Sequence, residues 1–281
     1  MPHSAPCPLT QLARQAKAAI YSLLLINPVL LAQPLLASET LPSTVCEQFP
    51  TIAVDTGKRS EDKDWQGTQQ LSPTVSILVL AGHADLQTSG TNGQAVADGA
   101  DPMQPGMTDE AFWNLATAQR IARLGRQRGL NIFFYDPFFY DPVVRHIPDN
   151  DAPRTNWSTG KRHVEAGGYA LEIHYNAYSP DGTGSGIIPR VHEGQTVIDE
   201  YLASEFGAFP LDFRRGNLGA PRRGITILEV GNLEGDLEEK LRDTATRDRA
   251  LNAIADRIVT AIEKTPIAKA IGACSTPLPT R

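Results

Sequence analysis

The sequence predicts one α/β domain, built on a mostly parallel central sheet with helices on both faces. Three observations predict it. Several short apolar runs are typical of strands that are buried on both faces, as in a parallel sheet. An amphipathic segment separates the first two runs, which is the order of a βαβ crossover. The 281 residues are enough for a full hydrophobic core, and no internal repeat divides them.

The first 37 residues differ from the rest of the chain. Two basic residues, Arg14 and Lys17, precede an apolar run and several small residues, which is the order of a secretory signal peptide. Pro28 and Pro34 interrupt the apolar run, and this argues against a stable membrane anchor. We therefore expect an exported protein, periplasmic or secreted, with no membrane span after processing.

Two segments flank the predicted domain. Residues 38–73 are rich in proline, glycine and charge and indicate a linker or an ordered arm, and residues 265–281 form a tail. Export would remove Cys7 and leave Cys46 and Cys274 near the two ends. In an oxidising compartment this pair favours a disulfide across the domain, with two unrelated thiols as the alternative.

The elements of the domain, residues 74–264, follow from apolar patterning. Thr108 is a good helix cap, with acids in the turn that follows it. A glycine- and proline-rich loop at 82–107 precedes this helix; loops of such length are often functional, although many are simply mobile. In chain order we expect strands at 76–81, 130–135, 169–176, 185–191 and 224–231, and helices at 108–128, 159–168, 196–206 and 237–263.

Four side chains capable of chemistry stand at the ends of these elements: His83, Glu110, His174 and Glu229. Ligand sites in open α/β sheets lie at the carboxyl ends of the strands, so we expect the four to converge there. Two imidazoles and a carboxylate are a common ligand set for catalytic zinc, and a second carboxylate can carry a proton to a leaving nitrogen. A strand-end histidine is also compatible with a structural role, and Glu110 with stabilising the helix dipole.

The motifs around these residues follow a distinctive order: Gly82-His83, then Glu110-x-x-x-Asn114-Leu115-Ala116, then Ile173-His174-Tyr175-Asn176-Ala177, then Leu228-Glu229-Val230-Gly231. The chain in this respect resembles the zinc-dependent N-acetylmuramoyl-L-alanine amidases of the Amidase_3 type, over residues 74–264. The resemblance implies a phosphorylase/hydrolase-like fold, Zn²⁺ on His83, Glu110 and His174, and Glu229 as catalytic acid/base. It also implies cleavage of the amide between N-acetylmuramic acid and L-alanine in peptidoglycan.

Several residues depart from the family pattern. Leu80-Ala81 replaces the usual Asp-Pro before Gly-His, Glu172 stands where a small serine is usual, and Gly231–Gly235 differs from the usual sequence after the late acid. Glu172 and Asp85 each stand two residues from a histidine, as an outer partner or an alternative ligand. Two other functions therefore remain open: a zinc amidohydrolase or carboxypeptidase-like enzyme acting on a soluble acyl-amino acid or peptide, and a catalytically inactive wall-binding module.

Charge narrows the class of partner. The formal net charge is -6 at pH 7, whereas a nucleic-acid footprint needs a basic patch. We therefore expect no nucleic-acid partner. With the family resemblance, we expect a peptidoglycan or muropeptide substrate and a monomeric protein.

Overall fold

A computed structural model describes residues 49–84, 102–105, 107–136, 151–176, 184–192, 194–213 and 219–269, all within one compact unit, Thr44–Arg281. The predicted signal peptide, Cys46, Cys274, Asp85 and most of the 82–107 loop lie outside the described residues. Among the helices in this part of the chain, none combines the length and the apolarity that crossing a membrane requires.

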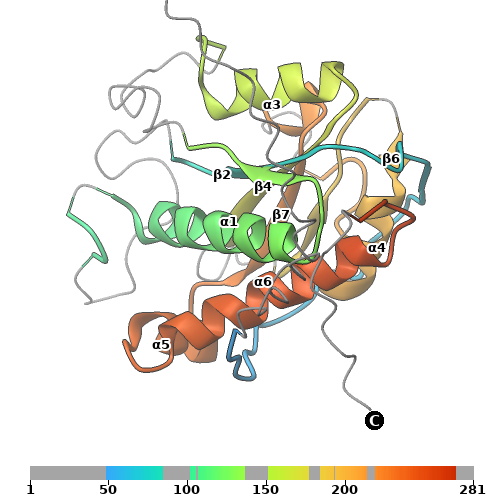
Figure 1. Cartoon of the computed structure of the whole chain (residues 1–281). Helices are drawn as coiled ribbons and strands as arrows, with labels where there is room; N and C mark the ends of the chain where they lie inside the picture. The colour runs from blue at the N-terminus through green and yellow to red at the C-terminus, as the bar shows by residue number, and fades with distance from the viewer. Residues whose placement is uncertain are drawn as a thin grey trace, which may run out of the picture. The chain divides into compact units, whose positions relative to one another are not determined.

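A five-stranded sheet lies at the centre of the fold, in the order β3-β2-β4-β7-β5 (Figure 1). Its first four strands are parallel, and β5 pairs with β7 in the antiparallel direction. The strands are β2 (Ile77–Ala81), β3 (Ile132–Phe134), β4 (Tyr169–Asn176), β5 (Gly186–Ile188) and β7 (Thr226–Asn232). The predicted α/β fold with a mostly parallel sheet is confirmed.

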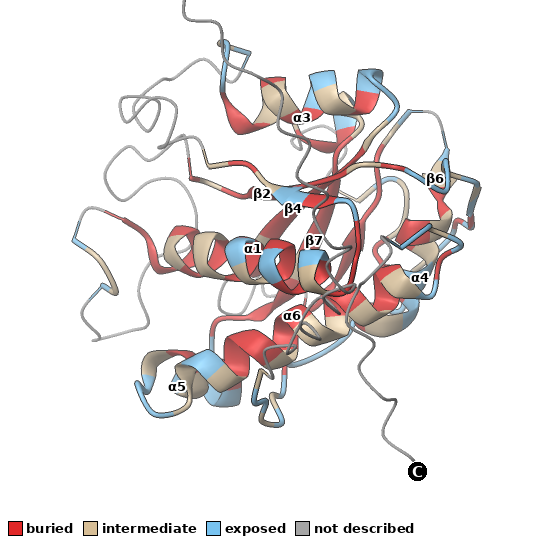
Figure 2. Ribbon diagram, in the orientation of Figure 1, coloured by how far each residue is buried: buried red, intermediate tan, exposed pale blue. Residues whose placement is uncertain are grey.

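Helices cover both faces of this sheet. In Figure 1, α3 lies on one side of the strands, and α1 and α6 lie on the other. The helices are α1 (Asp109–Gln127), α3 (Asn156–Glu165), α4 (Val197–Phe206), α5 (Gly235–Arg242) and α6 (Arg247–Glu263), with a short 3₁₀ helix η2 (Pro221–Arg223) before β7. Buried residues gather in the strands and along α1 and α6 (Figure 2).

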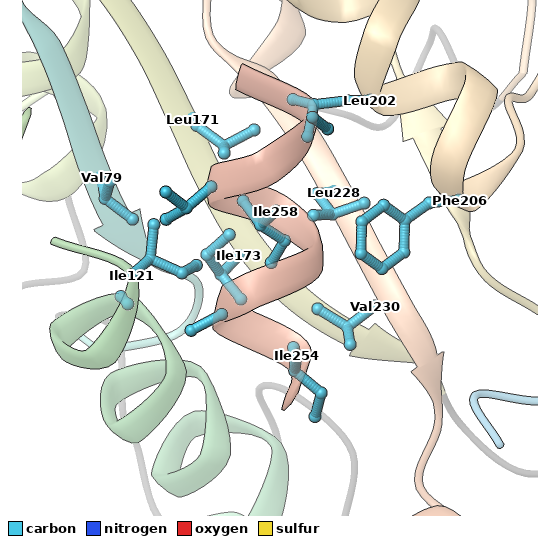
Figure 3. Packing of buried hydrophobic residues seen from close by; sticks show 14 of the residues in the cluster. Val79, Ile121, Leu171, Ile173, Leu202, Phe206, Leu228, Val230, Ile254 and Ile258 are labelled. Carbon is cyan, nitrogen blue, oxygen red and sulfur yellow. The ribbon is translucent and has the colours of Figure 1, made fainter. Parts of the chain in front are cut away.

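Alternation along the strands divides the apolar core into two clusters, because successive side chains of a strand point to opposite faces. Val79 and Ile173 belong to the larger cluster, in which Ile121 of α1 and Ile258 of α6 also lie (Figure 3). Leu80, next to Val79 in the chain, belongs instead to the smaller cluster with residues of α3. The sheet is therefore buried on both faces, as the unbroken apolar runs predict.

The predicted helix at 237–263 is wrong in one respect: it is two helices, α5 and α6, separated at 243–246. Asp243 is extended, and its carboxylate accepts a hydrogen bond from the backbone of Ala245 at 3.0 Å. The Thr246 hydroxyl donates to the carbonyl of Lys240 at 2.8 Å. These side chains take backbone groups that a continuous helix would pair, so the helix ends there.

Two short strands lie outside the sequence predictions. β1 (Gly67–Gln69) and β6 (Gln195–Thr196) form a separate two-stranded parallel sheet. β1 follows Trp65, whose indole donates to the carbonyl of Phe209 at 2.9 Å, so the segment before β2 packs on the domain. Strands of this length are too short to show a period in the sequence.

Candidate metal centre

The turn after β2 fixes the position of His83. Its φ of 61° lies in the left-handed region, which costs a residue with a side chain about 1–2 kcal/mol. Two buried asparagines from opposite faces of the sheet hold the peptides just before it. Asn156 of α3 donates to the carbonyl of Ala81, and Asn114 of α1 donates to the carbonyl of Gly82 at 2.9 Å. The strained backbone is thus fixed by both helical layers.

Gly82 allows the imidazole of His174 to lie directly against the β2 backbone. Its amide still donates to the carbonyl of Ile173 at 2.9 Å, so it remains paired with β4 beyond the end of β2. A Cβ atom at this position would lie 2.3 Å from Cε1 of His174, well inside the contact distance of two carbon atoms. Any side chain at position 82 would therefore displace the ring.

The structure brings His83, Glu110 and His174 together. Glu110 lies in the first turn of α1 and is 4% exposed. Its Oε1 is 3.0 Å from Nδ1 of His174 and 3.3 Å from Nε2 of His83. The two imidazole rings meet edge to face, with centroids 4.9 Å apart. One ligand atom from each residue lies within 4.8 Å of the other two, so a single metal ion can reach all three.

Glu229 lies beside this group on the neighbouring strand. Its position on β7 pairs in register with His174 on β4, so the two side chains project from the same face of the sheet. The carboxylate is half-buried and close enough for its charge to raise the pKa of His174. Glu229 therefore lies on the same face of the sheet as His174, one strand away.

Opposing effects act on the two central groups. Burial raises the pKa of Glu110, but the charge of His83 and hydrogen bonds with His174 and His83 outweigh it and hold the pKa far below its usual range. Burial lowers the pKa of His174, but the bond to Glu110 and the charges of Glu172 and Glu229 raise it well above the usual value. Without a metal, a proton on His174 stabilises the surrounding carboxylates, and a bound cation would replace that proton.

Glu172 also faces His174. It is 2% exposed, and its Oε2 lies 3.7 Å from Nε2 of His174. The indole Nε1 of Trp157 donates to both Glu172 oxygens, at 3.1 and 3.2 Å. Sequence reasoning singled out Glu172 but missed Trp157. The other predicted neighbour, Asp85, lies outside the described residues.

Of the two asparagines that hold the turn, sequence reasoning named Asn114 only as a position in the motif after Glu110 and missed Asn156. Asn114 carried a signal, because it stands four residues after Glu110 and thus on the same face of α1. The sequence gives no comparable signal for Asn156, because the helix to which it belongs begins earlier than the pattern predicts.

The donor set fits zinc. Two imidazole nitrogens and one carboxylate oxygen are a common catalytic zinc set, which leaves one position for water or substrate. Ca²⁺ and Mg²⁺ prefer oxygen ligands alone, which two histidines do not offer. His83, Glu110 and His174 form the one group of this kind among the residues that the structure describes.

No protein-family model and no curated protein matches the sequence. Solved structures with a similar fold include the N-acetylmuramoyl-L-alanine amidase from Clostridium difficile 630, at 13% identity and a TM-score of 0.40 over 68% of this chain and 96% of that chain. The catalytic domain of CwlV, from Bacillus (Paenibacillus) polymyxa var. colistinus, matches at 16% identity and a TM-score of 0.42 over 67% and 99%. The amidase AmiC2 of Nostoc punctiforme matches at 13% identity and a TM-score of 0.39 over 69% and 99%. These likenesses are too distant to assign an activity to this chain.

Proposed function

We propose that this protein is a zinc-dependent hydrolase that cleaves an amide bond, and that the bond joins N-acetylmuramic acid to L-alanine in peptidoglycan. The observation that carries the proposal is the meeting of His83, Glu110 and His174, with Glu229 beside them on the next strand. Zinc held by the first three would lower the pKa of a bound water to about 7 and would polarise a carbonyl.

Each residue has a separate task in this proposal. His83 would bind through Nε2, His174 through Nδ1 and Glu110 through Oε1, because these atoms face one another. Glu229 would accept a proton from the attacking water and pass it to the leaving nitrogen, so that the amine departs neutral. The contacts of Glu110 with the two histidines outweigh its burial and keep it ionised, as a ligand must be.

The choice of substrate rests on the sequence. The order of the four motifs resembles that of the muramyl amidases, and the predicted signal peptide at residues 1–37 would deliver the protein to the cell wall. We therefore propose that residues 74–264 act as a monomeric catalytic domain in the periplasm or outside the cell.

The test uses purified, zinc-loaded protein and isolated peptidoglycan, with new L-alanine amino termini as the readout. The wild type should release them, and Glu229→Gln should abolish release but keep zinc bound. An intact, zinc-loaded wild type that releases none, while a known muramyl amidase does so in the same buffer, would contradict the proposed substrate.

The same ligand set also fits the hydrolysis of a soluble acyl-amino acid or peptide. The sequence after Glu229 favours this alternative, because Gly231–Gly235 departs from the muramyl pattern at the end of β7. A panel of acylated amino acids and short peptides, assayed beside peptidoglycan, separates the two substrates. Protein that remains metal-free in zinc-replete medium would instead support a binding module without catalysis.

A further inference from the structure

The imidazole of His174 lies between two carboxylates. On one side its Nδ1 is 3.0 Å from Glu110. On the other side its Nε2 is 3.7 Å from Glu172. Nδ1 faces Glu110 and Nε2 faces Glu172, so the ring of His174 lies between the two carboxylates. This arrangement favours Glu172 as an outer partner of the ring over Glu172 as a fourth ligand.

Glu172 is an unusual residue for its place in the fold. It lies in the middle of a central parallel strand and is 2% exposed. A buried charge costs several kcal/mol unless partners compensate it. Within the described residues neither lysine nor arginine pairs with Glu172; its polar partners there are the indole of Trp157 and the ring of His174.

Trp157 is itself held in place. The guanidinium of Arg223 lies 4.8 Å from the centroid of its ring, and that guanidinium is paired with Asp151 at 2.6 Å. The backbone of Gly219 packs so closely on the ring that a Cβ atom there would lie 2.1 Å from it. The indole N–H is therefore aimed at Glu172 by contacts on its other sides.

We propose that Glu172 and Trp157 are positioning residues for the metal centre. Glu172 accepts the Nε2–H of His174, which leaves Nδ1 unprotonated and directed toward Glu110 and His83, and Trp157 holds Glu172 in that orientation. Metal-bound histidines usually donate their second N–H in this way. The inference rests on the proposed zinc site. The 3.7 Å separation is that of an ion pair, and a hydrogen bond needs the atoms to close by about 0.8 Å, to about 2.9 Å.

Two measurements on the full-length protein test this inference without using activity. Competition with a chelator gives the dissociation constant for Zn²⁺, and ¹⁵N NMR of the imidazoles shows which nitrogen of His174 carries the proton. In the zinc-loaded wild type we expect the proton on Nε2. Glu172→Leu should weaken zinc binding by roughly 10–100-fold. Glu172→Gln keeps an acceptor oxygen, so it should keep the tautomer and lose less affinity.

Trp157→Phe removes the indole N–H but keeps most of the apolar ring, so it should weaken zinc binding less than Glu172→Leu and shift the Nε2–H resonance. It also keeps the test decisive if Glu172→Leu does not fold. The control is Glu200→Gln on α4, which removes a carboxylate paired with Lys63 and should leave zinc affinity unchanged.

Two results would overturn the inference: zinc affinity and tautomer unchanged in Glu172→Leu and Trp157→Phe, or zinc bound through Nε2 in the wild type. Either result leaves the proposed hydrolysis intact. Conversely, if the wild-type protein binds zinc through Nδ1 of His174 but cleaves no peptidoglycan, only the proposed substrate is contradicted.

Discussion

The two faces of β4 carry opposite chemistry. Leu171, Ile173 and Tyr175 point to the side of α1 and α6, and each is at most 1% exposed. Glu172 and His174, which alternate with them, point to the other side, where charged groups gather at the carboxyl end of the sheet. One strand thus supplies core packing through one set of residues and the candidate site through the next.

This difference shows how a central strand tolerates buried charge. On the apolar face Leu171 and Ile173 need only a good fit of shapes, because dispersion and water exclusion have no direction. Tyr175 adds a hydrogen bond between its hydroxyl and that of Thr117 at 2.7 Å. On the charged face each group needs a specific partner: Glu110 and Glu172 both face His174, and Trp157 donates to Glu172. The two faces should therefore respond differently to substitution.

The largest expected effect on stability comes from the apolar face. Ile173→Ala should lower the free energy of unfolding by about 2–5 kcal/mol, because it leaves a cavity between β4 and the helices. Zinc affinity of the folded protein should stay within about twofold, since Ile173 points away from the ligands. Denaturant unfolding measures the change in stability, and chelator competition measures the zinc affinity. If the substitution lowers the free energy of zinc binding by as much as it lowers the free energy of unfolding, the two faces are not independent.

A pH series sharpens the comparison, because the charged face holds an imidazole and carboxylates, whereas the titratable groups of β4 on the apolar face are tyrosine hydroxyls, whose pKa values burial raises further. The metal-free protein holds a proton on His174 to a higher pH than usual, so its stability contribution is complete below about pH 6.5 and is lost as pH rises through the raised pKa. The lowered pKa of Glu110 contributes stability above about pH 4.5 that is lost as pH falls toward its folded pKa.

Zinc must displace the His174 proton, so its affinity should rise by about tenfold per pH unit, about 1.4 kcal/mol, up to that raised pKa. On raising the pH above about 6.5, the metal-free protein should lose stability, whereas the zinc-loaded protein should keep nearly constant stability, because the rising zinc affinity offsets the lost contribution of the proton. Thermal melts with and without zinc measure both trends. Parallel trends in the two forms would mean that His174 does not bind the ion.

The smallest expected effect compares two helix caps. Thr108 caps α1 two residues before Glu110, and Thr196 caps α4, which carries none of the possible ligands, each by accepting a backbone N–H bond. Thr108→Ala and Thr196→Ala should each cost about 1 kcal/mol of stability. Only Thr108→Ala should also weaken zinc binding, because it loosens the turn that carries Glu110. Equal zinc affinities in the two variants would argue that the first turn of α1 does not need its cap to hold the ligand.

Much of the fold could be predicted because its long elements have strong periods. β4 has the predicted bounds, and α1 begins at its predicted cap. The elements that hold His83, Glu110 and His174 were recognised for this reason. The break before α6 could not be foreseen, because Asp243 and Thr246 end α5 through side-chain bonds that leave the apolar stripe nearly unchanged.

The start of α3 shows why parts of the candidate site were missed. The pattern places the helix at 159–168, but it begins at Asn156, with Thr155 accepting the backbone N–H of Ser158 as its cap. That pattern places Asn156 and Trp157 before the helix, although one holds the β2 turn and the other holds Glu172. An error of three positions at a helix start hides the residues in its first turn.

The two asparagine contacts around Ala81 and Gly82 have a consequence for the order of assembly. One comes from α3 and the other from α1, so the backbone that presents His83 is complete only after helices have docked on both sides of the sheet. A chain in which only one of α1 and α3 has docked would bind a cation weakly. Cation binding would then require that both helices have docked, so the proposed hydrolase would be inactive in a partly folded chain.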